Sequence, residues 1–230
     1  MAVDALAGPD LVVIPLVPGY RRDWQDGTAR IEIRTWDGDD LGAGAADLDA
    51  THYGMVARGT LRIERPGMEP APLAAGCYSC MPGPVRFSGG DSSGLLVTLH
   101  GYWGLAQFGG PIETTGRLRY LDGGTDTLLV APPRRGDPCL NHLHLPPGCR
   151  QTAHTHPSVR IGLVLRGTGA CRTEHGLHRL TPGLGWLIPA DCLHAFHTEG
   201  DAMDVLAWHP DSDYGPTDED HPMLNRTVIR

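Results

Sequence analysis

One segment of the chain occurs twice, and this repeat limits the allowed folds more than any other feature. HYGMVARGTLRIE (52–64) and RIGLVLRGTGACR (160–172) share an apolar pattern around a glycine that ends in Arg-Gly-Thr. Downstream of each copy, LAAGCYSCMPG (73–83) and LTPGLGWLIPA (180–190) match at nearly the same spacing. Self-similarity at a fixed period indicates tandem copies of one structural unit.

The segment between the two copies gives the expected boundary. RLRYLDGGTD, which starts at Arg117, is polar and contains two adjacent glycines, as a linker often does. We therefore expect an N-terminal domain at 1–118 and a C-terminal domain at 119–230. The second domain ends in a polar tail, DSDYGPTDEDHPMLNRTVIR.

Short apolar segments separated by glycine and proline run along the whole chain. They are rich in Val, Ile, Leu and Trp, as strands are, and include ARIEIRTW (29–36), CLNHLHL (139–145) and MDVLAWH (203–209). The 31 glycines and 20 prolines are spread through the sequence, as many short turns require. The sequence predicts an all-β sandwich or barrel, with one short helix near 104–108.

Charge and composition exclude several kinds of partner. A formal net charge of −8 argues against binding to nucleic acid or to an anionic membrane. The apolar N-terminal run lacks a basic segment, and nothing approaches the roughly 18 apolar residues of a membrane span. Six cysteines are too sparse for a disulfide scaffold. We expect a cytoplasmic protein with free thiols; whether it forms a homodimer stays open.

Histidines in the second copy carry the strongest functional signal. His154 and His156 are one residue apart, and His194 follows after a further turn. On a strand, residues of one parity share a face, so His154, His156 and Arg160 are expected to point the same way. Imidazole binds Zn, Fe, Ni and Cu, and a third histidine from a neighbouring strand would complete a facial triad.

This part of the chain resembles the cupin pattern, G-x5-H-x-H-x3,4-E-x6-G followed by a P-x-G…H motif. The residues that fit it are Gly148, His154, His156, Gly167, Pro182, Gly183, Pro189 and His194. The resemblance covers roughly the last hundred residues, and the first copy resembles a degenerate cupin unit. It implies two tandem cupin jelly-roll barrels. It also implies one divalent transition metal per chain, Fe(II) before Zn(II), bound by His154, His156 and His194.

Arg160 departs from the cupin pattern, because it stands where that pattern has a metal-binding glutamate. A guanidinium stays protonated and has no lone pair to give to a metal. Three neutral ligands would leave the metal's charge uncompensated, and Arg160 adds a further positive charge. Such a site should attract a small anionic substrate, with a carboxylate fitting both metal and guanidinium. The alternative is that Arg160 turns aside to pair with an acidic residue.

The first copy lacks this set of ligands. Ala46 and Leu48 stand at the positions of the paired histidines, Phe87 stands at the position of His194, and His52 stands opposite Arg160. A lone histidine is more often a packed or hydrogen-bonded group than a ligand. We expect this copy to serve packing or to shape an entrance.

Three further histidines, His142, His144 and His209, lie on predicted strands. If Leu143 and Leu145 face the core, His142 and His144 face outwards. His209 ends the strand VLAWH, where it is a candidate for general acid–base catalysis near the barrel mouth.

Three functions fit these features. The first is a non-haem iron oxygenase acting on a small anionic substrate. The resemblance implies it, since three-histidine cupins include iron dioxygenases whose open coordination positions admit substrate and dioxygen together. The second is a zinc-dependent isomerase, lyase or rearrangement enzyme of specialised metabolism, such as one that forms N–N bonds. The third is a small-molecule binding module without turnover. The ligand set alone does not choose among them.

Overall fold

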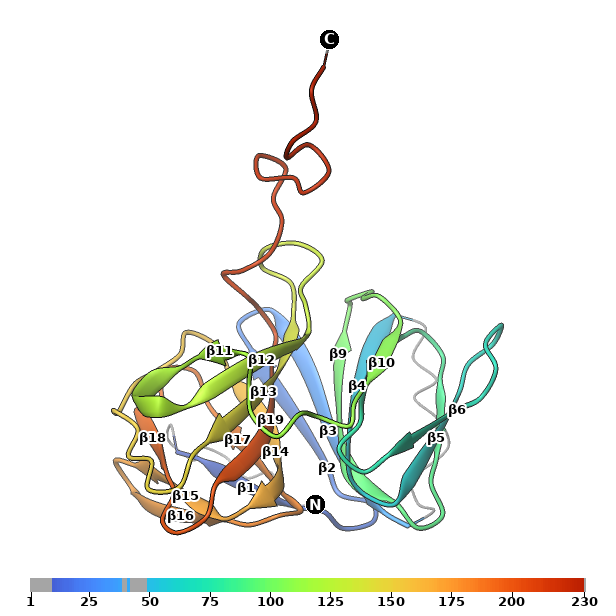
Figure 1. Ribbon diagram of the computed structural model, residues 1–230. Coiled ribbons are helices and arrows are strands. Elements are labelled where there is room, and N and C mark those ends of the chain that lie inside the picture. The colour runs from blue at the N-terminus through green and yellow to red at the C-terminus, as the bar shows by residue number, and fades with distance from the viewer. Residues whose placement is uncertain (1–9, 39–40, 42–48, 230) are drawn as a thin grey trace.

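The computed structural model describes residues 10–38, 41 and 49–229, and their regular structure is almost entirely β-strand (Figure 1). The first group of strands is β1 (Val12–Pro15), β2 (Arg21–Asp26), β3 (Ala29–Asp37), β4 (Ala50–Arg58), β5 (Thr60–Glu64), β6 (Ala71–Ala74), β7 (Tyr78–Pro82), β8 (Arg86–Ser88), β9 (Ser93–His100) and β10 (Gln107–Gly109). The second group is β11 (Leu118–Arg119), β12 (Thr125–Val130), β13 (Cys139–Leu145), β14 (Arg160–Gly167), β15 (Gly169–Thr173), β16 (Gly176–Leu180), β17 (Leu184–Ile188), β18 (His194–His197) and β19 (Met203–His209). Within the described residues one 3-10 turn, η1 (Leu121–Gly123), lies between β11 and β12.

The two groups of strands pair in the same pattern, so the repeat in the sequence is also a repeat in the fold. In the first group a six-stranded sheet has the order β10-β7-β4-β9-β3-β2, and a smaller sheet has the order β6-β5-β8. In the second a seven-stranded sheet has the order β1-β17-β14-β19-β13-β12-β11, and a smaller sheet has the order β16-β15-β18. Each large sheet and its small sheet form one jelly-roll unit, and the predicted all-β cupin architecture is confirmed.

The glycines of the repeated Arg-Gly-Thr segments end the equivalent strands β4 and β14. Gly59 and Gly167 both have φ at +68°, a conformation that L side chains rarely adopt. A Cβ on Gly167 would lie 1.7 Å from the carbonyl oxygen of Ala202, and one on Gly59 would lie 2.5 Å from that of Asp91. Glycine is therefore required at both corners for the conformation and for the close approach of the neighbouring chain.

The strand β1 departs from the division at residue 118. It belongs to the first part of the sequence but pairs antiparallel with β17, with Val12 opposite Leu187 and Pro15 opposite Leu184. Ile14 of this strand is fully buried in the core between the large sheets. The equivalent edge of the first unit is covered by β10, which pairs with β7. One strand of the N-terminal segment therefore completes the C-terminal sheet.

Three apolar cores hold the molecule together. The largest lies between the two large sheets, which stand beside each other in Figure 1, and it includes Ile33 and Tyr53 from one and Leu163 and Trp208 from the other. The rings of Tyr53 and Trp208 are 5.5 Å apart. Each jelly-roll unit has a further core between its large and small sheets. The central strands β4, β9 and β14 are thus covered on both faces and are largely buried, whereas the edge strand β2 is polar and partly exposed.

Two expectations about local structure are resolved by the fold. The prediction of a short helix near 104–108 is wrong, because residues 102–106 are irregular and 107–109 form the edge strand β10. No helix long and apolar enough to cross a membrane is found in the described ranges. The polar C-terminal segment extends away from the two units (Figure 1).

Candidate metal centre

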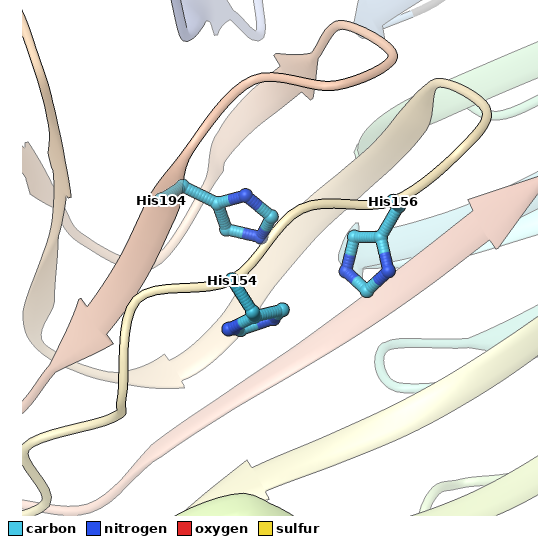
Figure 2. A group of neighbouring side chains, drawn as sticks. All are labelled: His154, His156 and His194. Atoms are coloured by element: carbon cyan, nitrogen blue, oxygen red, sulfur yellow. The ribbon is translucent and has the colours of Figure 1, made fainter.

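Three histidine side chains converge at one end of the C-terminal unit. Their ring centroids are 5.0 Å apart for His154 and His156, 4.5 Å for His154 and His194, and 5.2 Å for His156 and His194. One nitrogen from each ring lies within 4.8 Å of the others. Figure 2 shows the rings turned toward a common space, with His194 on β18 and the other two on the segment before β14.

The backbone fixes two of these rings. The Nδ1 atom of His154 is 2.8 Å from the carbonyl oxygen of Thr152, and that of His194 is 2.9 Å from the carbonyl oxygen of Cys192. A carbonyl oxygen can only accept, so each Nδ1 carries the proton and each Nε2 keeps its lone pair. Hydrogen bonds of this kind orient the histidine ligands of metal sites. The donor set and its orientation fit a divalent transition metal.

His154 and His156 do not share the face of a regular strand with Arg160, contrary to expectation. His154 and His156 lie outside the regular strands, and β14 begins only at Arg160. Their segment is instead held by a bridge in which His154 and His194 exchange backbone hydrogen bonds of 2.9 and 3.0 Å. The three predicted histidines are brought together, but by a bridged loop rather than by the parity of one strand.

Burial and neighbouring positive charge keep two of the histidines neutral. Burial lowers the pKa of His156 to about 3, and Arg160 and His194 add to the shift. Burial also lowers the pKa of His194 to about 4. A neutral imidazole is the form that binds a metal, so protons compete weakly for these two ligands at neutral pH.

A cavity of about 340 Å³ adjoins the histidines. Its apolar lining includes Leu143, Trp186, Ile188 and Phe196. Its polar lining includes, besides the three histidines, Arg119, Tyr120, Asp126, Asn141, Gln151, Arg160 and His209. A mostly apolar cavity with a few convergent polar groups has the character of a small-molecule site.

Arg160 lines this cavity and is also held by its own segment. Its guanidinium donates to the hydroxyl of Ser158 at 2.5 Å and to the carbonyl oxygen of Ser158 at 3.1 Å. A carboxylate oxygen of Asp211 lies 3.9 Å away, so an acidic neighbour is present but distant. Both sequence interpretations of Arg160 therefore keep structural support: it faces the cavity, and it has an acidic residue nearby.

His209 also lines the cavity, but both of its ring nitrogens already have protein neighbours. Its Nε2 is 2.8 Å from the sulfur of Cys139, and its Nδ1 contacts the backbone carbonyl oxygen of Asp211. Burial raises the pKa of the Cys139 thiol to about 12, so this thiol stays protonated. A base held in this way can act only if one of these contacts is exchanged for the substrate.

Several polar groups of the cavity were missed by sequence reasoning. Asp126 accepts a hydrogen bond of 2.8 Å from Asn141, and burial raises the pKa of its carboxyl. Tyr120 lies with its hydroxyl 3.5 Å from Nε2 of His154. Asn141 could have been found, because it shares parity with Leu143, which was expected to face the core. Asp126 and Tyr120 carried no comparable signal.

The strand pairing corrects the comparison with the first copy. Ile63 pairs with Phe87, and Cys171, the equivalent of Ile63, pairs with Phe196. Phe87 is therefore the counterpart of Phe196. By the same register, the position of His194 is taken by the buried Val85, which is no ligand either.

The remaining positions of the first copy, His52, Ala46 and Leu48, give no further evidence about metal binding in this unit. The Nδ1 atom of His52, which is fully buried, is 2.9 Å from the hydroxyl of Thr98. Ala46 and Leu48 lie outside the described residues.

His142 and His144 point away from the cavity, as expected, but the outward exposure expected of them is wrong. His142 is fully buried, and both rings contact one carboxylate oxygen of Asp204, at 2.8 and 2.9 Å. Arg166 donates to the other oxygen at 3.1 Å. The face of β13 turned away from the cavity therefore carries a polar network in which His142 and Asp204 are buried and Arg166 is partly exposed.

Comparisons with known proteins agree with this fold. Residues 141–209 match the family model described as Cupin domain. No curated protein matches the chain significantly. A "Cupin 2 conserved barrel domain protein" from Leptotrichia buccalis is similar in structure, with a TM-score of 0.60 and 16% identity over 90% of this chain and 92% of that one.

Two further solved structures are similar over most of their length. A putative glyoxylate induced protein from Pseudomonas aeruginosa has a TM-score of 0.62 and 16% identity over 94% of each chain. A salicylate 1,2-dioxygenase from Pseudaminobacter salicylatoxidans has a TM-score of 0.63 and 11% identity over 98% of this chain and 88% of that one. At such identities the likeness shows a shared fold and not a shared activity.

Proposed function

We propose that this chain, which carries a cupin domain at residues 141–209 and has the cupin fold, is a metal-dependent enzyme acting on a small anionic substrate. The observation that carries the proposal is the convergence of His154, His156 and His194 beside a cavity that Arg160 also lines. The three histidines would hold one divalent metal per chain, since the first unit offers Val85 where the second has His194.

Each part of the cavity has a defined task in this proposal. When bound, Fe(II) would supply redox chemistry with dioxygen, whereas Zn(II) would supply a Lewis acid. Arg160 would orient an anionic group of the substrate, such as a carboxylate, through charge-assisted hydrogen bonds. Leu143, Ile188 and Phe196 would exclude water and bind the apolar part of the substrate. Asp126, whose carboxyl pKa is raised by burial, is placed to exchange a proton with the substrate.

Oxygenation by an iron enzyme is the favoured chemistry. Three neutral ligands leave coordination positions for other molecules, and one protein with this fold is a salicylate 1,2-dioxygenase. A zinc-dependent isomerase, lyase or rearrangement enzyme is the alternative, because the same histidines suit zinc. A binding protein without turnover is the third candidate, because both ring nitrogens of His209 already contact Cys139 and Asp211, so this histidine is not free to act as a base.

Metal analysis combined with oxygen uptake tests these three functions. The purified protein is analysed for metal, reloaded with Fe(II) or with Zn(II), and assayed against a panel of small aromatic and aliphatic carboxylates. Iron at one equivalent with substrate-dependent oxygen uptake supports the oxygenase. Turnover with zinc and no oxygen uptake supports the alternative, and binding without turnover under either metal supports the third function. A protein that retains no divalent metal after reloading contradicts the proposal as a whole.

A further inference from the structure

The outer face of the small sheet in the second unit carries a row of basic side chains. Ala170 on β15 pairs with Arg179 on β16 and with His197 on β18, and an isolated bridge joins His197 to Arg150. Residues directly opposite each other in antiparallel strands share a face, so these four side chains form one line across the sheet. The short side chain of Ala170 leaves space in that line between its longer neighbours.

A hollow of about 510 Å³ lies over this row. It shares no lining residue with the cavity beside the three histidines. Its lining also includes the hydroxyl side chains of Thr168 and Thr181, and one acidic residue, Glu199. We call this hollow the arginine groove, after the basic residues that line it, Arg150, Arg172, Arg179 and His197.

The positive charges of the arginine groove are not neutralised by neighbouring side chains. None of its three arginines forms an ion pair with a residue that the structure describes. The Nη1 atom of Arg150 donates to the carbonyl oxygen of Thr198 at 2.5 Å, which fixes the guanidinium and leaves its charge in place. Burial lowers the pKa of His197, and the charges of Arg150 and Arg172 lower it further, so both guanidinium groups lie near this ring.

The equivalent face of the first unit shows that the fold does not require this charge. With Ile63 equivalent to Cys171, the counterparts of Ala170, Arg172, Arg179 and His197 are Arg62, Glu64, Pro72 and Ser88. There Arg62 donates to Glu64 at 3.2 Å, so the single basic side chain is paired. The basic cluster is therefore particular to the second unit, in a chain whose formal net charge is −8.

We propose that the arginine groove binds a small molecule that carries two or more phosphate or carboxylate groups. A guanidinium binds either group through two parallel N–H donors. Arg179 and Arg150 are three strand spacings apart, about 14 Å between their backbones, so their side chains reach toward a ligand from both ends of the row. One monovalent anion would leave most of this charge uncompensated.

The chain's own acidic segment does not occupy this place. The strands β15 and β16 lie at the lower end of the molecule in Figure 1, whereas the C-terminal segment leaves from the upper end. A separate anion is therefore the ligand that the charge of the groove calls for. The proposal requires neither a metal nor turnover, so it stands apart from the function proposed above.

Calorimetry on metal-free protein tests the proposal, because pyrophosphate and citrate would otherwise bind the metal themselves. Each is titrated at constant ionic strength, with acetate as a monovalent comparison. Pyrophosphate or citrate should bind one site with a Kd below about 1 mM, and acetate should not saturate. Tighter binding of pyrophosphate assigns the groove to phosphate groups, and tighter binding of citrate assigns it to carboxylates.

Variants then place the binding site. Arg172→Met and Arg179→Met should each weaken the polyanion by about tenfold or more, because each removes a charge-assisted contact. Glu199→Gln should bind more tightly, since it removes the acidic side chain of the groove. Arg86→Met is the matched control, because Arg86 is an exposed arginine on β8, the counterpart of β18 in the first unit, and should leave the affinity unchanged. Melting temperatures confirm that each variant is folded.

Three results would overturn the proposal. The first is a Kd above about 1 mM for both polyanions. The second is a loss in Arg86→Met equal to the loss in the groove variants, which would mean that the anion responds only to overall charge. The third is binding that is lost in Arg160→Met and kept in the groove variants, which would place the anion beside the three histidines. Metal content is measured separately, so failure here leaves the metal site untouched.

Discussion

His154 and His194 hold each other through a pair of backbone hydrogen bonds, 2.9 and 3.0 Å long, which form an isolated bridge between β18 and the segment before β14. Two candidate ligands are thus fixed by the main chain before any metal binds. His156 adds the third from the same bridged segment, with its ring centroid 5.0 Å from that of His154. A site fixed in this way loses little conformational entropy on binding a metal, so the metal should stabilise the folded state directly.

The first prediction concerns the three histidines. Alanine at His154, His156 or His194 should remove most of the bound metal, because two imidazoles are too few ligands. With metal at about a hundredfold excess over its Kd, the parent should gain about 3 kcal/mol of stability, and the variants should gain almost none. Elemental analysis and thermal unfolding with and without metal provide the measurement. His197→Ala, on the same strand as His194, is the control, and full occupancy in any two ligand variants would show the assignment to be wrong.

The second prediction concerns Arg160. Arg160→Met should keep the metal and weaken binding of an anionic substrate by about 2–5 kcal/mol if the cavity is dry. Arg160→Glu should retain or raise metal affinity, since it restores a carboxylate, and should lower activity further by occupying a coordination position and repelling the anion. Metal content and steady-state kinetics are compared for both variants, with the exposed Arg86→Met as control. Full activity of Arg160→Glu would contradict the role of Arg160 as an anion clamp.

The third prediction concerns pH and Asp204. Burial raises the pKa of this carboxyl, but hydrogen bonds from His142 and His144 and the charge of Arg166 lower it by more, so it ends below its usual value of 3.8. The unfolded state then binds the proton first as the pH falls. The stability from this carboxylate is therefore present above about pH 4 and lost as the pH falls through the folded pKa.

Asp204→Asn should cost about 2–3 kcal/mol at pH 7, because it removes charge-assisted hydrogen bonds. The difference from the parent should shrink below pH 4, since the parent then loses the same charge. Urea unfolding at pH 7 and pH 3 measures both values, and Asp218→Asn, at an exposed position, is the control. A difference that is independent of pH would mean that the charge of Asp204 contributes nothing.

The fourth prediction separates backbone conformation from close packing at glycine. Gly148 and Gly167 have similar φ angles, +73° and +68°, but a Cβ on Gly148 would meet nothing within 4 Å. Gly148→Ala should cost about 1–2 kcal/mol for the left-handed conformation alone. Gly167→Ala adds a contact of 1.7 Å with the backbone of Ala202 and should cost about 3 kcal/mol or more. Equal losses in the two variants, measured by urea unfolding, would show that the close contact relaxes freely.

The local structure could be read largely from the sequence, because alternation and glycine punctuation act over short distances. The repeat predicted equivalent strands, and the two Arg-Gly-Thr segments form equivalent turns at the ends of β4 and β14. The pairing of β1 with β17 could not be predicted, since Val12–Pro15 lies in an apolar run broken by prolines and nothing in it specifies a partner. Long-range partner choice depends on which sheet edge remains uncovered, and a local pattern does not contain that information.

The candidate site shows a similar limit. The spacing of His154, His156 and His194 was sufficient to predict that the three lie close together, as they do in the structure. The counterpart of His194 was misplaced because the turn after β17 is two residues longer than the turn after β7, so that Val85 and not Phe87 takes its place. Asp191, at φ +58°, lies in that longer turn. An insertion of this kind leaves the flanking motifs recognisable and changes only the register of the next strand.

The pairing of β1 with β17 also sets the order of folding, because the C-terminal sheet is complete only when both strands are present. Ile14 lies opposite Gly185 in the seven-stranded sheet, so β1 cannot pair until the much later segment that forms β17 has been synthesised. Contacts of such high sequence separation slow folding and leave unpaired edges exposed in the interval. A fragment starting at residue 119 would lack this strand altogether, and its exposed β17 edge should make it aggregate. A separate peptide of segment 10–20 would cover this edge but not the apolar face that packs against the first unit, so solubility should return only when both are supplied.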